Sequence, residues 1–459
     1  MIKVRSEIRG VFIHESVYGY PHDWSIIAQT LSQYKINAMF VSDLGIGRRR
    51  PDAEISTAIA ACHAYGIEYH SSMFALEQNK NAETAAITSG GEIFNEWVQC
   101  PIMAHDNGIA AVQEYLTSFP SVDGIMLDYI RYEVADMCYC PQCRAAFEQW
   151  LGEGPIEDWT PFYPSGARWL EYAEWRTIPV TELVRDMRAA ALAIKPDLVI
   201  SEAAWSYFSD CPIYWRKWIG QDTGNWIAND YLDFVAPMMY TKTIYGASGE
   251  TLESFIDATQ KYMTGGVEGK IPLVALLRND FSTSADLTPE ELKAQIDYVR
   301  SRGLNGWIIW RYGGPGVDDN GYFPDITDYL AILDMPPTFT LSNILYSKNG
   351  GEITVSWSTD LPATSRVEYS AEPLFNAVWS VWGGFNYWRI NSASKEAFED
   401  LTPKTEHSLI IPSNALYFRV QSKDESGTVT SPIFYTGIMR ILSVNSNIAG
   451  VPFEIRRIT

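Results

Sequence analysis

The strongest constraint on the fold of this chain is a regular alternation of short apolar segments and amphipathic helical segments over its first 335 residues. Each apolar segment has the length and composition of a strand buried on both faces of a parallel sheet. The eight predicted strands are Gly10–Glu15, Asn37–Gly45, Ile67–Leu76, Gly124–Asp128, Leu198–Trp205, Asp233–Thr241, Ile271–Arg278 and Gly306–Tyr312. Eight strand–helix units predict a (β/α)8 barrel.

The competing fold is an open, doubly wound α/β sheet. That fold requires a glycine-rich phosphate turn after the first strand, and the residues here are His14-Glu15-Ser16. Amphipathic helices fit between the predicted strands. The clearest is Thr288–Arg302, which begins with a capping threonine, a proline and two glutamates. The barrel is therefore the favoured fold.

The pattern changes near Met335-Pro336-Pro337, where the helical periodicity ends. Short alternating segments separated by Gly, Pro, Asn and Asp follow and predict a β-sandwich. Its predicted strands are Ile353–Trp357, Ser365–Tyr369, Glu406–Ile411, Tyr417–Ser422 and Ile433–Thr436. The expected organisation is a catalytic barrel over residues 1–335, a sandwich over 336–436, and a β-rich tail over 437–459 that opens another small β-module.

Composition narrows the function. With 459 residues and 46% hydrophobic content, the chain can bury a large core. A net charge of −21 argues against nucleic acid as a partner, because phosphate binding needs a basic surface. No segment reads as a membrane span or a signal peptide, so the chain is expected to be cytoplasmic, or extracellular after trimming. The 16 Trp and 26 Tyr offer flat faces for sugar rings, although most should fill the core.

Polar and aromatic residues gather where the predicted strands end, which is where (β/α)8 barrels carry their chemistry. Asp128 and Glu202 end adjacent strands and are predicted as the two carboxyl groups that hydrolysis of a glycosidic bond requires. Asp128 would act as nucleophile. Glu202, in apolar surroundings that raise a carboxyl pKa, would be the acid/base. The expected substrate-binding residues are His14, Glu15, Asp43, His70, Arg131, Trp205, Tyr240, Arg278, Trp310 and Arg311.

Because adjacent strands lie ~4.8 Å apart, carboxyl groups at their ends should be close together, which favours a retaining enzyme. A mechanism with two carboxyl groups needs no catalytic cofactor. Two simpler alternatives remain: Asp128 pairs with Arg131, or Glu202 forms a salt bridge to Arg131 or Arg278. A different class of function is a barrel that binds glycan, or builds a surface layer, without cleaving it. A metal-dependent deacetylase is a third option, but only His14 and His70 lie on neighbouring strand ends.

Five segments resemble the glycosyl-hydrolase-like barrel proteins of family 10. They are Arg9–Glu15 (R-G-V-F-I-H-E), Ile36–Val41 (I-N-A-M-F-V), Val122–Tyr132 (V-D-G-I-M-L-D-Y-I-R-Y), Leu198–Trp205 (L-V-I-S-E-A-A-W) and Tyr231–Tyr240 (Y-L-D-F-V-A-P-M-M-Y). The resemblance implies a barrel hydrolase that acts on polysaccharide or peptidoglycan-type glycan. Asp128 matches the acid that ends the family's fourth strand. At Glu202 the chain departs from the small residue expected in many relatives.

Two further resemblances concern single segments. C-Y-C-P-Q-C-R-A-A-F-E-Q-W-L is similar to a segment of family 42 β-galactosidases, which implies a structural zinc held by Cys138, Cys140 and Cys143, with Cys100 as the expected fourth ligand. Free thiols, or a Cys138–Cys140 or Cys140–Cys143 disulfide, are the alternatives. The run I-T-V-S-W-S-T-D-L-P-A-T-S-R-V-E-Y-S resembles fibronectin type III modules and implies a spacer or binding module.

Overall fold

The computed structural model describes most of the chain. The described residues are 7–14, 22–77, 79–207, 218–245, 250–263, 271–280, 286–317, 323–333, 341–370, 375–382, 385–392, 396–415, 417–424, 427–430 and 434–435. The predicted junction near Met335 and the predicted tail over 437–459 lie outside them. Among the helices of these ranges, none has the length and hydropathy needed to cross a bilayer.

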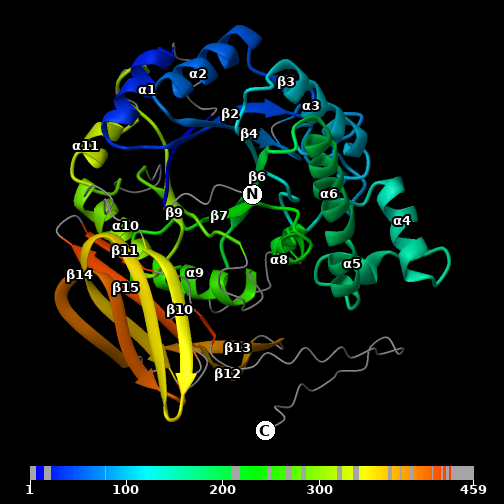
Figure 1. Cartoon of the computed structure of the whole chain (residues 1–459). Coiled ribbons are helices and arrows are strands. Elements are labelled where there is room, and N and C mark those ends of the chain that lie inside the picture. Colours follow the sequence, from blue (N-terminus) through cyan, green and yellow to red (C-terminus); the bar gives the residue numbers. More distant parts are fainter. Residues whose placement is uncertain are drawn as a thin grey trace.

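Eight parallel strands close into a barrel, which confirms the predicted fold class (Figure 1). The strand order is β1-β9-β8-β7-β6-β5-β4-β2, and pairing of β1 with β2 closes the circle, while β3 (Arg48–Arg49) pairs antiparallel with β2. The bounds are β1 (Ile8–Ile13), β2 (Ala38–Gly45), β4 (Glu68–Phe74), β5 (Gly124–Asp128), β6 (Val199–Trp205), β7 (Phe234–Met238), β8 (Ala275–Arg278) and β9 (Gly306–Trp310). Seven of the predicted strands contain one of these, and the predicted strand Gly10–Glu15 overlaps β1, which begins two residues earlier, at Ile8.

Helices surround the strands on the outside (Figure 1). They are α1 (Trp24–Gln33), α2 (Asp52–Ala64), α3 (His105–Ser118), α4 (Pro141–Leu151), α5 (Trp169–Trp175), α6 (Thr177–Ile194), α8 (Thr223–Ala228), α9 (Leu252–Ala258), α10 (Pro289–Ser301) and α11 (Ile326–Leu330), with a 3₁₀ turn η2 (Thr160–Phe162) and a π-helical turn η3 (Thr259–Met263). The predicted start of α10 is confirmed, because Thr288 and Glu291 form a reciprocal capping box.

Side chains that alternate along the strands separate two cores. One set fills the inside of the barrel and includes Phe12, Phe40, Met126, Phe234 and Ile308. The other set packs between the strands and the helices and forms the larger core. This alternation decides which residue at a strand end faces the barrel axis and which faces the helices.

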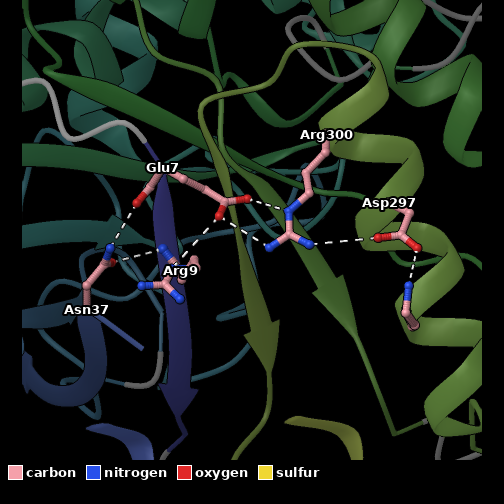
Figure 2. Close-up of polar contacts among 6 residues, drawn as sticks. Glu7, Arg9, Asn37, Asp297 and Arg300 are labelled. Atoms are coloured by element: carbon pink, nitrogen blue, oxygen red, sulfur yellow. Dashed lines mark hydrogen bonds and ion pairs between the residues drawn. The ribbon is translucent and has the colours of Figure 1, made fainter. Parts of the chain in front are cut away.

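A polar network at the N-terminal end of the barrel joins the start of β1 to α10 and to the segment before β2 (Figure 2). The Glu7 carboxylate accepts hydrogen bonds from Arg300 Nε (2.8 Å) and Nη2 (3.3 Å). Asn37 Nδ2 donates to the Glu7 carbonyl oxygen at 2.8 Å, and Asn37 Oδ1 accepts from Arg9 N at 2.9 Å. Arg300 also lies 3.7 Å from Asp297. The network therefore ties α10 and the loop before β2 to the start of β1.

Replacing Arg300 with methionine should lower the free energy of unfolding of the barrel by about 1–2 kcal/mol, because the charged hydrogen bonds to a largely buried Glu7 are lost. Urea denaturation monitored by circular dichroism would measure this. Arg185→Met is the matched control, since Arg185 is exposed and its loss should cost less than about 0.5 kcal/mol. Equal losses in the two variants would contradict a stabilising role for the network.

The C-terminal part forms an antiparallel sheet that fits a β-sandwich-like domain, as predicted. Its strands are β10 (Leu341–Asn349), β11 (Glu352–Ser370), β14 (Glu396–Pro412), β15 (Tyr417–Asp424), β16 (Gly427–Thr430) and β17 (Phe434–Tyr435), and β12 (Phe375–Trp382) pairs separately with β13 (Phe385–Ser392). Trp357, Val367, Phe418 and Val420 belong to its core. Two predicted strands, Ile353–Trp357 and Ser365–Tyr369, are one strand, β11, which continues through a shift of register against β14 between Ser358 and Ala363.

Candidate active site

A cavity of about 310 Å³ lies at the C-terminal end of the barrel strands. Its walls come from the ends of β5 to β9 and the segments that follow them. The lining residues are Asp128, Tyr129, Arg131, Ala203, Trp205, Ser206, Met238, Tyr240, Glu250, Phe255, Leu276, Arg278, Trp310 and Arg311. Among the predicted site residues, the structure brings together Asp128, Arg131, Trp205, Tyr240, Arg278, Trp310 and Arg311.

Asp128 is the last residue of β5 and is 6% exposed. It lies two residues after Met126, which faces the inside of the barrel, so its side chain points the same way. Its Oδ1 accepts a hydrogen bond from Tyr129 N at 2.8 Å. Burial raises the pKa of Asp128 to about 6, against the opposing effect of the Arg131 guanidinium. The carboxyl group is therefore ionised at neutral pH and poorly solvated.

Arg131 lies beside Asp128, but the carboxyl groups nearest to its guanidinium are those of Glu77 and Glu133. Its Nη2 is 3.8 Å from Glu77 Oε2, and its Nη1 is 3.6 Å from Glu133 Oε2. The guanidinium carbon lies 4.9 Å from the ring centre of Tyr129 and 5.3 Å from that of Trp205. Within the described residues these contacts, rather than an Asp128 salt bridge, hold Arg131 in the cavity wall.

Two further arginines, Arg278 and Arg311, line the cavity at the ends of β8 and β9. Arg278 Nη2 is 3.1 Å from Asp280 Oδ1, and Arg311 Nη2 is 2.9 Å from Asp280 Oδ2. Trp310 directly precedes Arg311 in the sequence and pairs with Arg278 in the β8–β9 register. The rings of Trp310 and Tyr240 are 6.2 Å apart between centres. This wall thus combines aromatic faces with two guanidinium groups.

The prediction that Glu202 faces the cleft is wrong. Glu202 is fully buried, is absent from the cavity lining, and its Oε1 accepts a hydrogen bond from Thr223 Oγ1 (3.1 Å) in α8. In the strand register it pairs with Leu127, whose side chain belongs to the core between strands and helices. Burial raises the pKa of Glu202 well above its usual range, so the carboxyl group is neutral there. The suggested salt bridges of Glu202 to Arg131 or Arg278 are wrong for the same reason.

Asp43 and His70 also lie away from the cavity. The Asp43 carboxylate accepts hydrogen bonds from Tyr69 Oη (2.7 Å), Tyr115 Oη (2.8 Å) and Ser71 Oγ, outside the barrel wall. His70 is the third residue of β4, which continues to Phe74, so it lies inside the barrel below the rim. It fills the space above Gly124, where an added Cβ would be 2.2 Å from His70 Nδ1.

His14 lies next to the cavity but does not line it. Its ring centre is 4.2 Å from that of Trp310 and 5.9 Å from that of Phe74. Burial, followed by the charges of Arg311, Arg278 and Arg48, lowers the pKa of His14 to about 3. A neutral imidazole thus supports the Trp310 ring from behind. Glu15, the remaining predicted contact, lies outside the described residues.

Two carboxyl groups near the cavity were not among the predicted site residues. Glu250 follows β7 in a loop and lines the cavity together with Asp128. Glu77 follows β4 and shares Arg131 with Glu133. Burial, and then a hydrogen bond with Glu133, raises the pKa of Glu77 to about 9, so the Glu77 carboxyl group is protonated at neutral pH. Glu250 lies nine residues beyond its predicted strand, Asp233–Thr241, whereas Glu77 directly follows the predicted strand Ile67–Leu76 and therefore did carry the signal of a strand end.

The four predicted zinc ligands form one buried cluster. The sulfur atoms of Cys100, Cys138, Cys140 and Cys143 lie within 4.8 Å of one another, and all four are free thiols rather than disulfides. Cys100 Sγ is 3.7 Å from Cys140 Sγ and 3.5 Å from Cys143 Sγ. Zn–S bonds of about 2.3 Å place tetrahedral sulfur atoms about 3.8 Å apart, so these spacings fit a zinc ion. The cluster joins the segment after β4 to the segment after β5.

Comparisons with known proteins identify the fold. No protein-family model matches the sequence, and no curated protein matches it. The structure is similar to a β-galactosidase from Marinomonas ef1, at 11% identity and a TM-score of 0.52 over 67% of this chain and 55% of that chain. A β-galactosidase from Halorubrum lacusprofundi is 13% identical, with a TM-score of 0.50 over 66% of this chain and 52% of that chain.

A catalytic mutant of a family 42 β-galactosidase from G. stearothermophilus is 9% identical, with a TM-score of 0.50 over 67% of this chain and 51% of that chain. The chain therefore spans about half the length of these three proteins. At such identities the likeness is one of fold. The barrel of this chain has the fold found in glycoside hydrolases.

Proposed function

We propose that the chain is a glycoside hydrolase that acts on a poly- or oligosaccharide, with Asp128 as its first catalytic carboxylate. The observation that carries this proposal is a buried, ionised Asp128 in the wall of a cavity that also presents Trp205, Tyr240 and Trp310. Sugar rings stack on such aromatic faces, and a desolvated carboxylate is a stronger nucleophile or base than a hydrated one. A mechanism of two carboxyl groups needs no catalytic cofactor.

Glu250 replaces Glu202 as the proposed second carboxyl group. It is the other acidic residue among the described residues that line the cavity. Retention was expected because Asp128 and Glu202 end adjacent strands, and this reason no longer applies. Glu250 follows β7, two strands away from β5, which favours the wider carboxyl separation of inverting enzymes, ~6.5–9.5 Å. We therefore propose inversion at the anomeric carbon.

Glu250→Gln should reduce the hydrolysis of a natural polysaccharide by about 10²–10⁴-fold, because glutamine cannot transfer the proton. The measurement is the release of reducing ends from a panel of soluble polysaccharides, followed by NMR of the first product anomer. Glu253→Gln, on α9, is a matched control whose rate should equal that of the parent. If no polysaccharide of the panel is cleaved by the parent, the hydrolase proposal fails.

A barrel that binds glycan without cleaving it is the second candidate. The position of Glu202 favours it, because the expected acid/base residue faces α8 and not the cavity. The two proposals differ in one measurement: a binder should retain oligosaccharides and release no reducing ends.

We also propose a zinc ion at Cys100, Cys138, Cys140 and Cys143, where it would be structural. The support for zinc is the close set of four sulfur atoms and the two backbone N–H groups directed at them, from Ile87 to Cys138 Sγ and from Cys143 to Cys140 Sγ.

We further propose that residues 336–436 form a fibronectin type III-like module, separate from a barrel that ends near residue 335.

A further inference from the structure

The cavity wall contains more guanidinium groups than a neutral sugar requires. Arg131, Arg278 and Arg311 all line it, whereas the lining carboxyl groups are Asp128 and Glu250. The three arginines come from different barrel strands, after β5, at the end of β8 and after β9. They therefore surround the cavity from two sides. This is unusual in a chain whose net charge is −21, because the protein as a whole repels anions.

Arg278 and Arg311 are held in place by one carboxylate. Asp280 binds Arg278 through Oδ1 (3.1 Å) and Arg311 through Oδ2 (2.9 Å). The Arg311 guanidinium also lies 3.8 Å from the ring centre of Phe323. The Arg278 side chain is 25% exposed and that of Arg311 is 13% exposed. The two planar groups are thus fixed before a ligand arrives, and Arg278 is the more exposed of the two.

The positive charges of Arg278 and Arg311 lower the pKa of the neighbouring His14, in addition to the larger effect of its burial. Both Arg311 and Arg278 help to keep His14, behind Trp310, in its neutral form. A neutral imidazole adds no charge of its own to the wall.

We propose that the sugar bound beside Trp310 carries a carboxylate, and that Arg278 and Arg311 recognise it, so that the substrate is an acidic glycan. This inference rests on the proposed function, because it takes the cavity to be the glycan site. A guanidinium fork binds a carboxylate through two parallel hydrogen bonds, which gives both strength and orientation. A neutral hydroxyl group at the same place would offer these charged donors only a neutral acceptor and hence a weaker hydrogen bond. The proposal needs only that these guanidinium groups form the wall, alongside the partners that they already have.

The test compares acidic glycans with their neutral methyl esters. Oligomers of galacturonate, alginate and hyaluronan, each with its methyl ester, would be titrated into the full chain carrying Asp128→Asn, so that binding is measured without cleavage. At least one acidic oligomer should bind about 10-fold or more tightly than its ester, as expected for a charge-assisted bidentate contact. Adding Arg278→Gln should bring the two affinities to within about twofold of each other, since the fork is then lost.

Two further variants separate recognition from folding. Arg278→Lys keeps the charge without the fork and should retain part of the preference, so it serves if Arg278→Gln does not fold. Arg188→Gln is the matched control, because Arg188 pairs with Asp233 and is absent from the cavity lining. It should leave the preference for the acid unchanged.

The proposal is overturned if no acidic oligomer binds more tightly than its ester, or if Arg278→Gln preserves the full preference. Cleavage assays with the parent chain separate this from the proposed function. Hydrolysis of neutral glycans without any preference for acids would overturn the inference and leave the hydrolase intact. Preferential binding of acids without cleavage would support the inference and refute the hydrolase.

Discussion

Asp128→Asn is expected to lower the rate of glycan hydrolysis by about 10²–10⁴-fold while leaving glycan binding within a few-fold of the parent. Asparagine has nearly the same shape as aspartate and can still accept the hydrogen bond from Tyr129 N, but it carries no charge. A neutral amide cannot attack an anomeric carbon or take a proton from water. The rate is to be measured as reducing-end release on the best substrate of the polysaccharide panel.

The matched control is Glu202→Gln on the adjacent strand. Because Glu202 is buried against Thr223 and already neutral, glutamine preserves its charge state, and the activity should stay within about twofold of the parent. If instead Glu202→Gln abolishes hydrolysis and Asp128→Asn does not, the roles assigned to the two acids are reversed.

The pH dependence gives the same assignment a second test. The working form of Asp128 is the carboxylate, and burial raises its pKa to about 6. The value of kcat/KM should therefore be lost as the pH falls through about 6, whereas an exposed aspartate would lose it only near 4. An acidic limb of the pH–rate profile near 4 would show that another carboxyl group limits the reaction.

Removal of the proposed zinc should lower the melting temperature by about 10 °C or more, because a closed thiolate site contributes several kcal/mol of folding free energy. The barrel itself should survive, since the four cysteines lie in the segments that follow β4 and β5 and not in the barrel strands. Purification under reducing conditions, metal analysis, and calorimetry before and after chelation would measure both the stoichiometry and the shift.

Cys140→Ser and Cys62→Ser form the matched pair for this experiment. Cys140 belongs to the sulfur cluster, whereas Cys62 is buried beside Met39 and lies outside it. Only Cys140→Ser should abolish zinc binding, and it should do so in protein that retains the circular dichroism of the barrel. Protein that contains no metal after purification under reducing conditions would rule out the site. A melting temperature that chelation does not change would rule it out as well.

Much of the barrel could be predicted because buried parallel strands have a recognisable sequence. An apolar run of five to eight residues that ends in polar residues marks both the strand and its end at the rim. Asp128, Arg278 and Arg311 could be placed in one cavity on this basis, since parallel strands all present their C-terminal ends to the same side. Proline was a less reliable signal. Pro362 separates the predicted strands Ile353–Trp357 and Ser365–Tyr369, yet β11 continues through it.

Glu202 was misplaced because the run L-V-I-S-E-A-A-W shows where a strand lies but not which face each residue takes. Side chains alternate along a strand, so Glu202 and Trp205, three positions apart, must face opposite sides. Trp205 lines the cavity, and Glu202 therefore faces α8. The register with β5 was needed to assign the faces, and register depends on packing across the whole barrel.

Glu250 could not have been found by such patterns, because it lies in a loop well beyond the end of its strand and that loop has no periodicity of its own. Its position depends on tertiary contacts, such as the hydrogen bond from Thr241 Oγ1 to the Glu250 carbonyl oxygen (2.6 Å). Glu77, by contrast, directly follows the predicted strand Ile67–Leu76 and was overlooked. Loops carry function on many scaffolds, and it is their conformation that decides which side chains meet.

The pairing of β1 with β9 has a consequence for how the protein is made. Ile8 pairs with Gly306, so β1 has one open edge until the last barrel strand has been synthesised. Gly306 allows the two backbones to meet closely, because an added Cβ would lie 2.0 Å from Ile8 O. An open edge of this kind invites pairing with other chains. At ~5–20 residues per second, translation of residues 341–435 takes about 5–20 s. The C-terminal sheet thus gives the nascent barrel time to close before the chain is released.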